Sequence, residues 1–263
     1  MEITENKADV RIYTLFSGSS GNSCYISCGD TEILIDAGKS MKAIRNALCE
    51  IGSSLDKISA ILITHEHSDH IKGLQMLCKH YKIPVYAAKG TAEMLINDVP
   101  PELINVYCAG DALDFGDVTV ESFETPHDSR MSTGYIISYC GRRFGYATDM
   151  GMLSRRIADK LAECEAAVIE SNYDLKMLRN GPYPYALKKR IESNVGHLDN
   201  NDCARLVSYI VSRSNTKKVL LAHLSAENNT PTVALETVNA RLKQDCLCAS
   251  VAVADRNCPT CLL

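Results

Sequence analysis

The 263-residue sequence lacks several features that mark particular classes of protein. No apolar run reaches the roughly 18 residues that suggest a membrane-spanning helix, so no membrane association is expected. The opening residues, MEITENKADVR, carry no apolar stretch behind a basic flank, which excludes a secretory signal and predicts a cytoplasmic protein. The formal net charge of −4 excludes binding to nucleic acid through overall basicity, so any nucleic acid must be held by a local site.

Internal repeats, low-complexity tracts and long charge runs are also absent. Hydrophobic residues make up 46% of the chain and charged residues 23%, which is typical of a globular protein and excludes disordered, collagen-like and coiled-coil chains. No linker divides the sequence, so we expect one domain over residues 1–263. The sequence predicts no oligomeric state.

Cysteine, by contrast, is abundant, with twelve residues. Most lie in apolar runs, and without an export signal we expect reduced, buried cysteines that act as small hydrophobic side chains rather than a disulfide framework. Cys258 and Cys261 form a CxxC pair in the last six residues. Because no second pair accompanies them, this is only a weak zinc signal.

The hydrophobic pattern predicts a mixture of short strands and helices. Strands are expected at Arg11–Phe16, Cys24–Ser27, Glu32–Ile35, Ala60–Ile63, Ile83–Tyr86, Val118–Phe123, Gly134–Cys140, Arg143–Ala147, Ala166–Glu170, Lys218–Leu221 and Ala249–Val253. Helices are expected from a Ser40 cap through Glu50, and at Ile71–His80, Thr91–Asn97, Leu153–Ala162, Tyr185–Ser193, Asp202–Ser212 and Thr232–Lys243. Two strand-rich halves with interspersed helices predict two packed sheets covered by helices, an α/β fold.

The central motif is HxHxDH, which follows the buried strand Ala60–Ile63 and contains His65, His67, Asp69 and His70. Three imidazoles and a carboxylate within six residues suit zinc, manganese or iron. Such a tight turn can divide its ligands between two neighbouring ions. A solvated histidine-rich loop is the alternative, and the placement of the other histidines argues against it.

Three more histidines stand beside predicted element ends. His127 and His223 each follow a strand, and His197 precedes a helix. Singly, each would more often be structural, but together with the motif they indicate one shared site. The remaining His80 lies at an ordinary helix end, where the helix dipole favours it.

Two aspartates also end apolar strands. Asp149 is placed to bridge two cations, with each oxygen serving one ion. Asp36 either orients a metal ligand through hydrogen bonds or simply begins a turn before Gly38, and the sequence leaves both readings open.

The HxHxDH motif, with a later His, Asp and His each at a strand end, resembles the metallo-β-lactamase superfamily from Asp36 to His223. The resemblance implies a four-layered αββα sandwich with a dinuclear metal site at one edge of the two sheets. It also implies the ligands: His65, His67 and His127 for the first metal, Asp69, His70 and His223 for the second, and Asp149 as the bridge.

Within the superfamily, the sequence is most similar to the YycJ (WalJ) family of bacterial hydrolases, which is associated with 5′-exonuclease activity on DNA. The matching stretches begin at Phe16, Ile63, Glu170, Gly181 and Leu224. Similarity to the late motifs of ribonuclease Z and related phosphodiesterases implies that His197 is catalytic rather than a ligand, and Asp69 is expected to take part in catalysis as well. One departure is Asp199, where this family is expected to carry serine.

Other residues are candidates for substrate binding. The turn that contains Ser17, Ser19, Ser20 and Asn22 has backbone N–H groups and hydroxyls that can hold a phosphate, although a plain hairpin turn is equally consistent. Asn228 and Asn229 are expected to bind substrate or to cap the following helix. The basic pairs Arg142-Arg143, Arg155-Arg156, Lys188-Lys189-Arg190 and Lys217-Lys218 either track a phosphate backbone or form solvated faces.

These observations predict a phosphodiesterase that uses two divalent ions (zinc, manganese or iron) and a metal-bound hydroxide to degrade DNA from a 5′ end. His197 would stabilise phosphoryl charge or protonate the leaving oxygen. One alternative is a phosphodiesterase for small molecules or cyclic nucleotides, which would use the same site. Another is a non-hydrolytic metal- or redox-sensing protein, which would leave His197 without a task.

Overall fold

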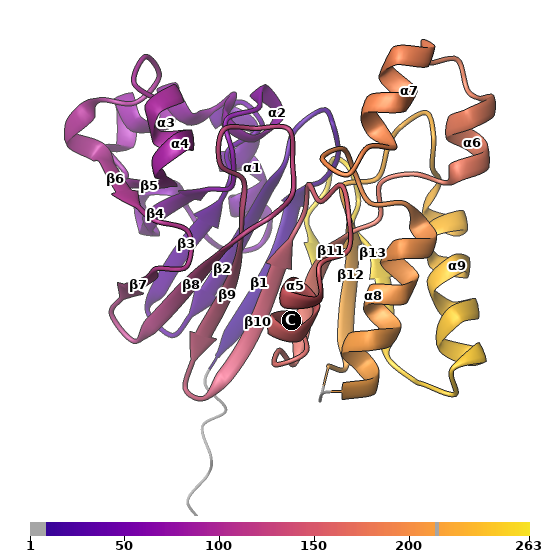
Figure 1. Ribbon diagram of the computed structural model, residues 1–263. Coiled ribbons are helices and arrows are strands. Elements are labelled where there is room, and N and C mark those ends of the chain that lie inside the picture. Colours follow the sequence, from indigo (N-terminus) through magenta and orange to yellow (C-terminus); the bar gives the residue numbers. More distant parts are fainter. Residues whose placement is uncertain (1–8, 214–215) are drawn as a thin grey trace, which may run out of the picture.

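A computed structural model describes residues 9–213 and 216–263, so the opening residues 1–8 of the signal-sequence argument lie outside the described residues. Two seven-stranded sheets lie face to face, and helices cover their outer faces (Figure 1). The first sheet contains β1 (Val10–Phe16), β2 (Ser23–Cys28), β3 (Thr31–Ile35), β4 (Ile58–Ile63), β5 (Val85–Ala88), β6 (Ile104–Tyr107) and β14 (Thr260–Cys261). The second contains β7 (Ala112–Phe115), β8 (Val118–Glu124), β9 (Thr133–Tyr139), β10 (Arg142–Ala147), β11 (Ala166–Glu170), β12 (Lys218–Ala222) and β13 (Ser250–Val253).

The helices form the two outer layers. The first sheet is covered by α1 (Met41–Glu50), α3 (Leu74–Tyr81) and α4 (Lys89–Met94), with α2 (Ser68–Ile71) at its end. The second sheet is covered by α5 (Arg155–Leu161), α8 (Asn200–Arg213) and α9 (Pro231–Gln244). A projecting pair, α6 (Leu175–Asn180) and α7 (Tyr185–Ile191), rises beside the sheet edge. Two short 3₁₀ helices, η1 (Leu55–Lys57) and η2 (Pro101–Leu103), complete the described elements. The predicted αββα fold is therefore confirmed.

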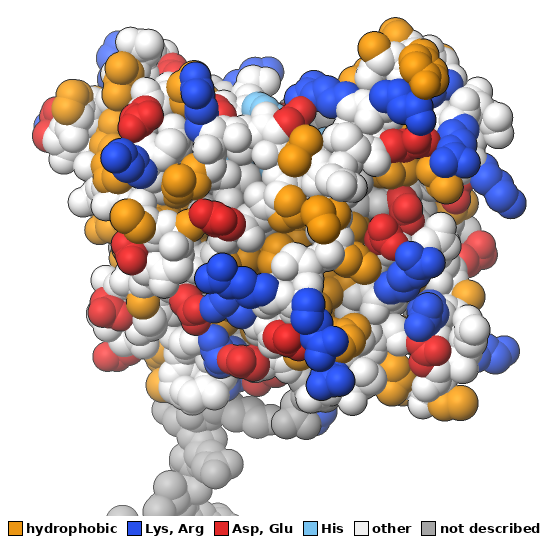
Figure 2. Space-filling view, viewed as in Figure 1, with side chains coloured by type: hydrophobic (Ala, Val, Ile, Leu, Met, Phe, Trp, Pro, Cys, Tyr) orange, Lys and Arg blue, Asp and Glu red, His pale blue; other side chains and the backbone are white. Residues whose placement is uncertain are grey.

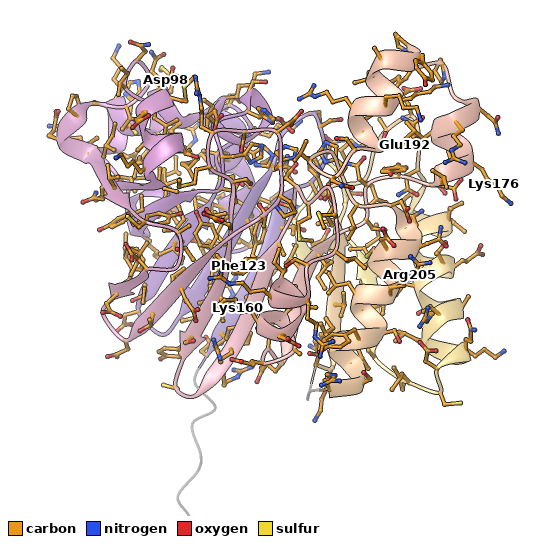
Figure 3. The ribbon with its side chains drawn as sticks, viewed as in Figure 1. Asp98, Phe123, Lys160, Lys176, Glu192 and Arg205 are labelled. Atoms are coloured by element: carbon orange, nitrogen blue, oxygen red, sulfur yellow. The ribbon has the colours of Figure 1, made fainter. Side chains whose placement is uncertain are left out.

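Apolar side chains join the layers in three cores. The central core lies between the sheets and includes Ile26, Val120 and Leu220. The two outer cores bury the apolar faces of the helices, and Phe123 of β8 packs in the one beneath α5 and α8 (Figure 3). Because strands in the middle of each sheet are covered on both faces, they appear in the sequence as continuous apolar runs.

Each sheet combines antiparallel and parallel pairing. In the first sheet β1, β2 and β3 pair antiparallel, while β3, β4, β5 and β6 pair parallel. The second sheet repeats this arrangement, with β10, β11, β12 and β13 parallel. Parallel strands bring their carboxyl ends to the same edge of a sheet. The loops that follow β4, β10, β11 and β12 therefore meet at one end of the sandwich.

Most predicted elements are present, and Ser40 caps α1 as expected by accepting a hydrogen bond from the backbone N–H of Ala43. The single helix expected at Ile71–His80 is instead two helices, α2 and α3. Strands β6, β7 and β14 were not predicted; all three lie at sheet edges. Edge strands of two to four residues are held by backbone pairing with one neighbour, so they leave little hydrophobic pattern in the sequence.

The prediction that the cysteines are buried is only partly correct. All twelve cysteines are free in the structure. Those that are buried are Cys24, Cys28, Cys78, Cys164 and Cys203, and the other seven are exposed. Among the described residues, no helix has the length and apolar character needed to cross a lipid bilayer.

Candidate metal centre and active-site pocket

The predicted ligands come from loops that leave the ends of both sheets. His65 and His67 follow β4, Asp69 and His70 lie on α2, and His127 follows β8. Asp149 follows β10 and His223 follows β12. Asp36, Asp149 and His223 have positive φ angles of 63°, 58° and 58°. Such left-handed backbone is costly for non-glycine residues and is concentrated at functional sites, where it turns the side chain sharply out of the strand direction.

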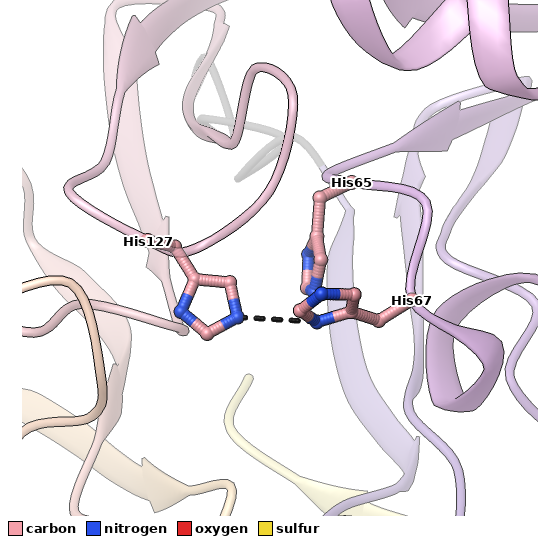
Figure 4. Close-up of side chains that lie close together, drawn as sticks. All are labelled: His65, His67 and His127. Carbon is pink, nitrogen blue, oxygen red and sulfur yellow. Dashed lines mark hydrogen bonds between the residues drawn. The ribbon is translucent and has the colours of Figure 1, made fainter. Parts of the chain in front are cut away.

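His65, His67 and His127 form one compact group of candidate ligands. Figure 4 shows His127 facing the other two rings, with its Nε2 atom 3.3 Å from Nδ1 of His67. One ligand atom from each residue lies within 4.8 Å of the others. Three imidazole nitrogens at this spacing can bind one divalent ion of the zinc type.

A second group contains Asp69, His70 and His223, again with ligand atoms within 4.8 Å of one another. The Oδ2 atom of Asp69 lies 3.6 Å from Nε2 of both histidines. Asp149 stands between the two groups, because its Oδ1 is 3.8 Å from Nε2 of His127 and its Oδ2 is 3.5 Å from Nε2 of His70. The structure thus brings all seven predicted ligands together.

Four of these imidazole rings are oriented through their Nδ1 atoms. Nδ1 of His70 donates to Oδ2 of Asp36 at 2.8 Å, and Nδ1 of His127 donates to the carbonyl of Gly196 at 3.0 Å. Nδ1 of His65 contacts Thr64 Oγ1 at 3.0 Å, and Nδ1 of His223 contacts Oε1 of Glu170 at 3.0 Å. Each contact leaves Nε2 available to a metal, which is how partners behind a metal site usually fix their histidines. Asp36 therefore has the orienting role rather than that of a simple turn residue.

The centre contains buried polar atoms that find no hydrogen-bond partner within the described residues: Nε2 of His65, Nε2 of His223 and Oδ2 of Asp149. Burying such atoms unpaired is costly, whereas each becomes satisfied if it ligates a cation. These residues fit divalent metal ions.

The electrostatics of His65, His127 and Asp149 agree with this fit. Burial lowers the pKa of His65 well below its ordinary value and lowers the pKa of His127, so both rings are neutral and free to coordinate. Burial opposes ionisation of Asp149, but His223, His70, His65 and His127 together hold the pKa of its carboxyl well below the ordinary value. For His70, burial is outweighed by Asp36, Asp149 and Asp69, which raise the pKa to about 9.

Glu170, at the end of β11, is a site residue that the sequence analysis did not identify. Its Oε1 atom accepts from Nδ1 of His197 at 2.7 Å as well as from His223, and its Oε2 accepts from the backbone N–H groups of Met150 and Leu198. Burial would keep this carboxyl neutral, but His197 and His223 lower its pKa. The available signal was an acidic residue at the end of an entirely apolar strand.

Comparison with known proteins places this arrangement in a family. Residues 31–224 match the family described as "Beta-lactamase superfamily domain". The chain is 39% identical over 233 residues to exodeoxyribonuclease YycJ of Bacillus anthracis, covering 88% of each chain. It is 38% identical over 235 residues to exodeoxyribonuclease WalJ of Streptococcus pneumoniae, covering 88% of this chain and 87% of that protein.

The chain belongs to the metallo-β-lactamase superfamily and, within it, to the family of YycJ and WalJ. It is accordingly a hydrolase. Among solved structures, the metallo-β-lactamase fold protein YhfI from Bacillus subtilis superimposes with a TM-score of 0.74 at 15% identity, covering 96% of this chain and 99% of that chain. At that identity the likeness concerns the fold alone.

In this metallo-β-lactamase superfamily hydrolase, the candidate metal centre opens into a cavity of about 390 Å³. Asp69, Asp149, His197 and His223 lie at its base, and Ser19, Tyr183 and Arg190 are among the other lining residues. Figure 2 shows a hollow at the top of the molecule, with histidine atoms in it and basic side chains on the α7 side. Arg190 of α7 pairs with Asp128, which in turn lies 3.5 Å from Nε2 of His127.

The Ser17–Asn22 turn of the hydrolase borders the same cavity, but its side chains have different roles. Ser19 lines the cavity, and the exposed Ser20 accepts a hydrogen bond from Lys39. Ser17 and Asn22 are buried: Ser17 Oγ accepts from the backbone N–H of His223 at 2.7 Å, and Asn22 Nδ2 donates to Oδ2 of Asp69 at 3.2 Å. These two residues support metal ligands and are not placed to touch substrate directly.

The burial of Asn228 and Asn229 does not favour the prediction that they bind substrate. Both are buried, with exposures of 0% and 4%. Asn229 Nδ2 donates to the carbonyls of Ser171 and Asn172, which ties the loop after β11 to the start of α9. The capping alternative is wrong, because Thr230 is the residue that caps α9.

The departure from the family at Asp199 also has a structural explanation. Its Oδ1 accepts from the backbone N–H groups of Asn201 and Asp202 at 2.6 and 3.0 Å, so it satisfies free donors at the start of α8. Aspartate and serine are both good residues for this position. The carboxylate is therefore engaged by the helix rather than by His197.

Proposed function

We propose that this protein is a dinuclear metal-dependent phosphodiesterase that removes nucleotides from a 5′ end of DNA. The observation that carries the proposal is His197, which lines the cavity beside the candidate ligand residues and donates to the buried Glu170 behind it. The two relatives at 38–39% identity, both named exodeoxyribonucleases, support DNA as the substrate.

Two divalent ions, when bound, would supply Lewis-acid activation of water and charge neutralisation of the scissile phosphate. His65, His67 and His127 would hold one ion, and Asp69, His70 and His223 would hold the other, with Asp149 shared. The chain prepares these ligands in advance, because Asp36 and Glu170 orient His70 and His223 from behind. Zinc, manganese and iron all suit this set of nitrogen and oxygen ligands.

His197 would act on the substrate through Nε2. Its Nδ1 atom donates to the carboxylate of Glu170, which fixes the ring orientation. His197 lines the cavity, and 22% of its side chain is exposed. It can therefore donate a proton to the leaving oxygen or a hydrogen bond to a phosphoryl oxygen. Seven other residues would suffice to hold two ions, which would leave His197 free for this task.

Two further residues of the cavity are suited to phosphate. Arg190 offers a guanidinium held in place by Asp128, and guanidinium groups match phosphate oxygens in geometry and charge. Ser19, which also lines the cavity, offers a hydroxyl and lies in a turn rich in backbone N–H groups. A phosphodiester seated between them would lie over the candidate metal centre.

The proposal is tested by hydrolysis assays with metal-loaded protein on linear 5′-phosphorylated DNA and on bis(4-nitrophenyl) phosphate. We expect both to be cleaved, and His197→Ala to retain its metals while turnover falls by about 10²–10⁴-fold. Rapid cleavage of the small ester with all DNA intact would contradict the nuclease and favour the small-phosphodiester alternative. Loss of metal in His197→Ala, with activity following metal content, would show that His197 is a ligand.

A further inference from the structure

Nine of the lysine and arginine side chains of the described residues pair with a nearby acid. Arg142 and Arg143, in a pair considered for phosphate binding, are instead joined to Glu165, Glu121 and Glu163. They lie at the start of β10, the end opposite Asp149. Lys160 pairs with Glu121 on the same side, while Lys176 projects outward from α6 (Figure 3). These cations are not positioned to follow a strand into the cavity.

Three cations near the cavity have no such acidic partner within the described parts of the chain. Burial lowers the pKa of Lys39, and the nearby positive charges of Lys72 and Arg256 lower it further. The three cations therefore lie close to one another. Within residues 9–213 and 216–263, none of the three has a carboxylate within 4.0 Å. A group of like charges without a counter-ion is unfavourable unless an anion joins it.

The Ser17–Asn22 turn is built to receive these side chains. A side chain at Gly21, where φ is +148°, would meet the Cδ atom of Lys39 at 2.7 Å, so the lysine stem lies directly against the glycine. The lysine Nζ then donates to Ser20 Oγ at 3.0 Å. On the other side of the turn, Arg256 Nε lies 3.7 Å from the position of a Cβ on Gly18, where φ is +118°.

The same cations adjoin residues that line the cavity. Ser20 follows Ser19, and Arg256 donates through Nη2 to the carbonyl of Leu224, which stands between His223 and Ser225. Lys72 ends the short helix α2 that carries Asp69. The charge group therefore adjoins the Ser17–Asn22 turn, whose Ser19 lines the cavity, whereas Arg190 lines the cavity from α7.

We infer that Lys39, Lys72 and Arg256 hold a phosphate of the substrate strand that flanks the scissile bond. The inference rests on the proposed function and narrows it, because a second phosphate site outside the metal centre is of use only for a polynucleotide. The two amines and the guanidinium, together with Ser20 Oγ, supply donors of the kind that phosphate oxygens accept. A small phosphodiester or a cyclic nucleotide has no second phosphodiester to place there.

The test is direct binding of a fluorescein-labelled, 5′-phosphorylated single-stranded DNA to the whole protein with EDTA present, so that no cleavage intervenes. The double variant Lys39→Met/Arg256→Gln removes two phosphate contacts. In a plot of log affinity against log salt concentration, each phosphate contact with a single strand contributes about −0.7 to the slope. Loss of two contacts should therefore make the slope shallower by roughly 1.4. At 0.1 M salt this corresponds to a loss of affinity of roughly 25-fold.

Lys57→Met is the matched control, because Lys57 is exposed at the opposite end of β4 from His65 and should leave affinity and slope unchanged. Lys72→Gln, an exposed position that is easily tolerated, should reproduce about half of the change in slope. Thermal denaturation verifies that each variant is folded.

The outcomes separate this inference from the proposed function. Equal affinity and slope in wild type and the double variant, or no binding by wild type, would overturn the phosphate site whatever the hydrolysis assays show. DNA binding with the predicted salt effects, but no cleavage by metal-loaded protein, would support the phosphate site and refute the nuclease. With cleavage present, the ratio of kcat/KM for DNA to that for the small ester should fall in the double variant.

Discussion

Replacing Glu170 by glutamine is the change that probes the centre most sharply, because one buried carboxylate accepts four hydrogen bonds. Its exposure is 0%, and its two oxygens serve His197, His223, Met150 N–H and Leu198 N–H. A glutamine has nearly the same shape but only one accepting oxygen. Either the two histidines or the two backbone N–H groups must therefore face an amide NH₂ group.

The size of the expected effect depends on which pair of donors, the two backbone N–H groups or the two histidines, loses its acceptor. If the amide NH₂ faces the backbone, two buried N–H groups are unsatisfied at about 1–3 kcal/mol each, so unfolding becomes easier by about 2–6 kcal/mol. If it faces the histidines, the Nδ1 atoms can no longer donate, and the proton moves to the Nε2 atoms that should bind metal and substrate. Metal affinity is then expected to fall about 10–100-fold, as for other partners behind metal ligands.

The assay combines thermal denaturation, metal analysis and hydrolysis of bis(4-nitrophenyl) phosphate. Glu163→Gln is the matched control, since this glutamate is on the surface with Arg143 as its partner and far from the ligands in the fold. We expect Glu170→Gln to lose metal affinity or stability together with turnover, and Glu163→Gln to change neither. A Glu170→Gln protein with wild-type stability, metal content and turnover would refute the proposed orientation of His197 and His223.

Three further predictions concern the ligands, the buried amides and metal removal. Asp149→Ala should weaken both metals, whereas His127→Ala should weaken mainly one, as measured by metal titration; equal and small losses would contradict the shared position of Asp149. Asn229→Ala should destabilise the fold by about 2–4 kcal/mol in chemical denaturation, because buried carbonyls lose their donor. Unchanged stability with weaker DNA binding would instead restore a substrate role for Asn229. Chelation should abolish hydrolysis and lower Tm, since ions that bind only the folded state stabilise it, and an unaltered Tm would count against a preformed centre.

The residues of the candidate metal centre could be grouped from the sequence because they are tied to strong local patterns. HxHxDH follows an apolar run, and Asp149 and His223 each end another. In a parallel arrangement such strand ends converge, so pattern and topology together locate the centre before any coordinates are known. The same reasoning identified Asp36 as a candidate for orienting a ligand, and its contact with His70 agrees with that reading.

Other features depend on contacts between distant segments and leave no such pattern. Glu170 is recognised only when β11 lies beside the loop that carries His197, 27 residues further along the chain. Asn228 and Asn229 resemble surface loop residues in sequence, yet they are buried because the start of α9 packs against the loop after β11. The unpaired charges of Lys39, Lys72 and Arg256 likewise come from three separate segments.

The most direct measurement of the central claim is a time course of digestion of linear duplex DNA labelled at either the 5′ or the 3′ end, run beside a closed circle. Metal-loaded protein should release the 5′ label early as short products, shorten the 3′-labelled strand progressively and leave the circle intact. Release of the 3′ label first would contradict the predicted polarity. Rapid nicking of the circle would contradict recognition of an end, and complete resistance of all three DNAs would contradict the nuclease itself.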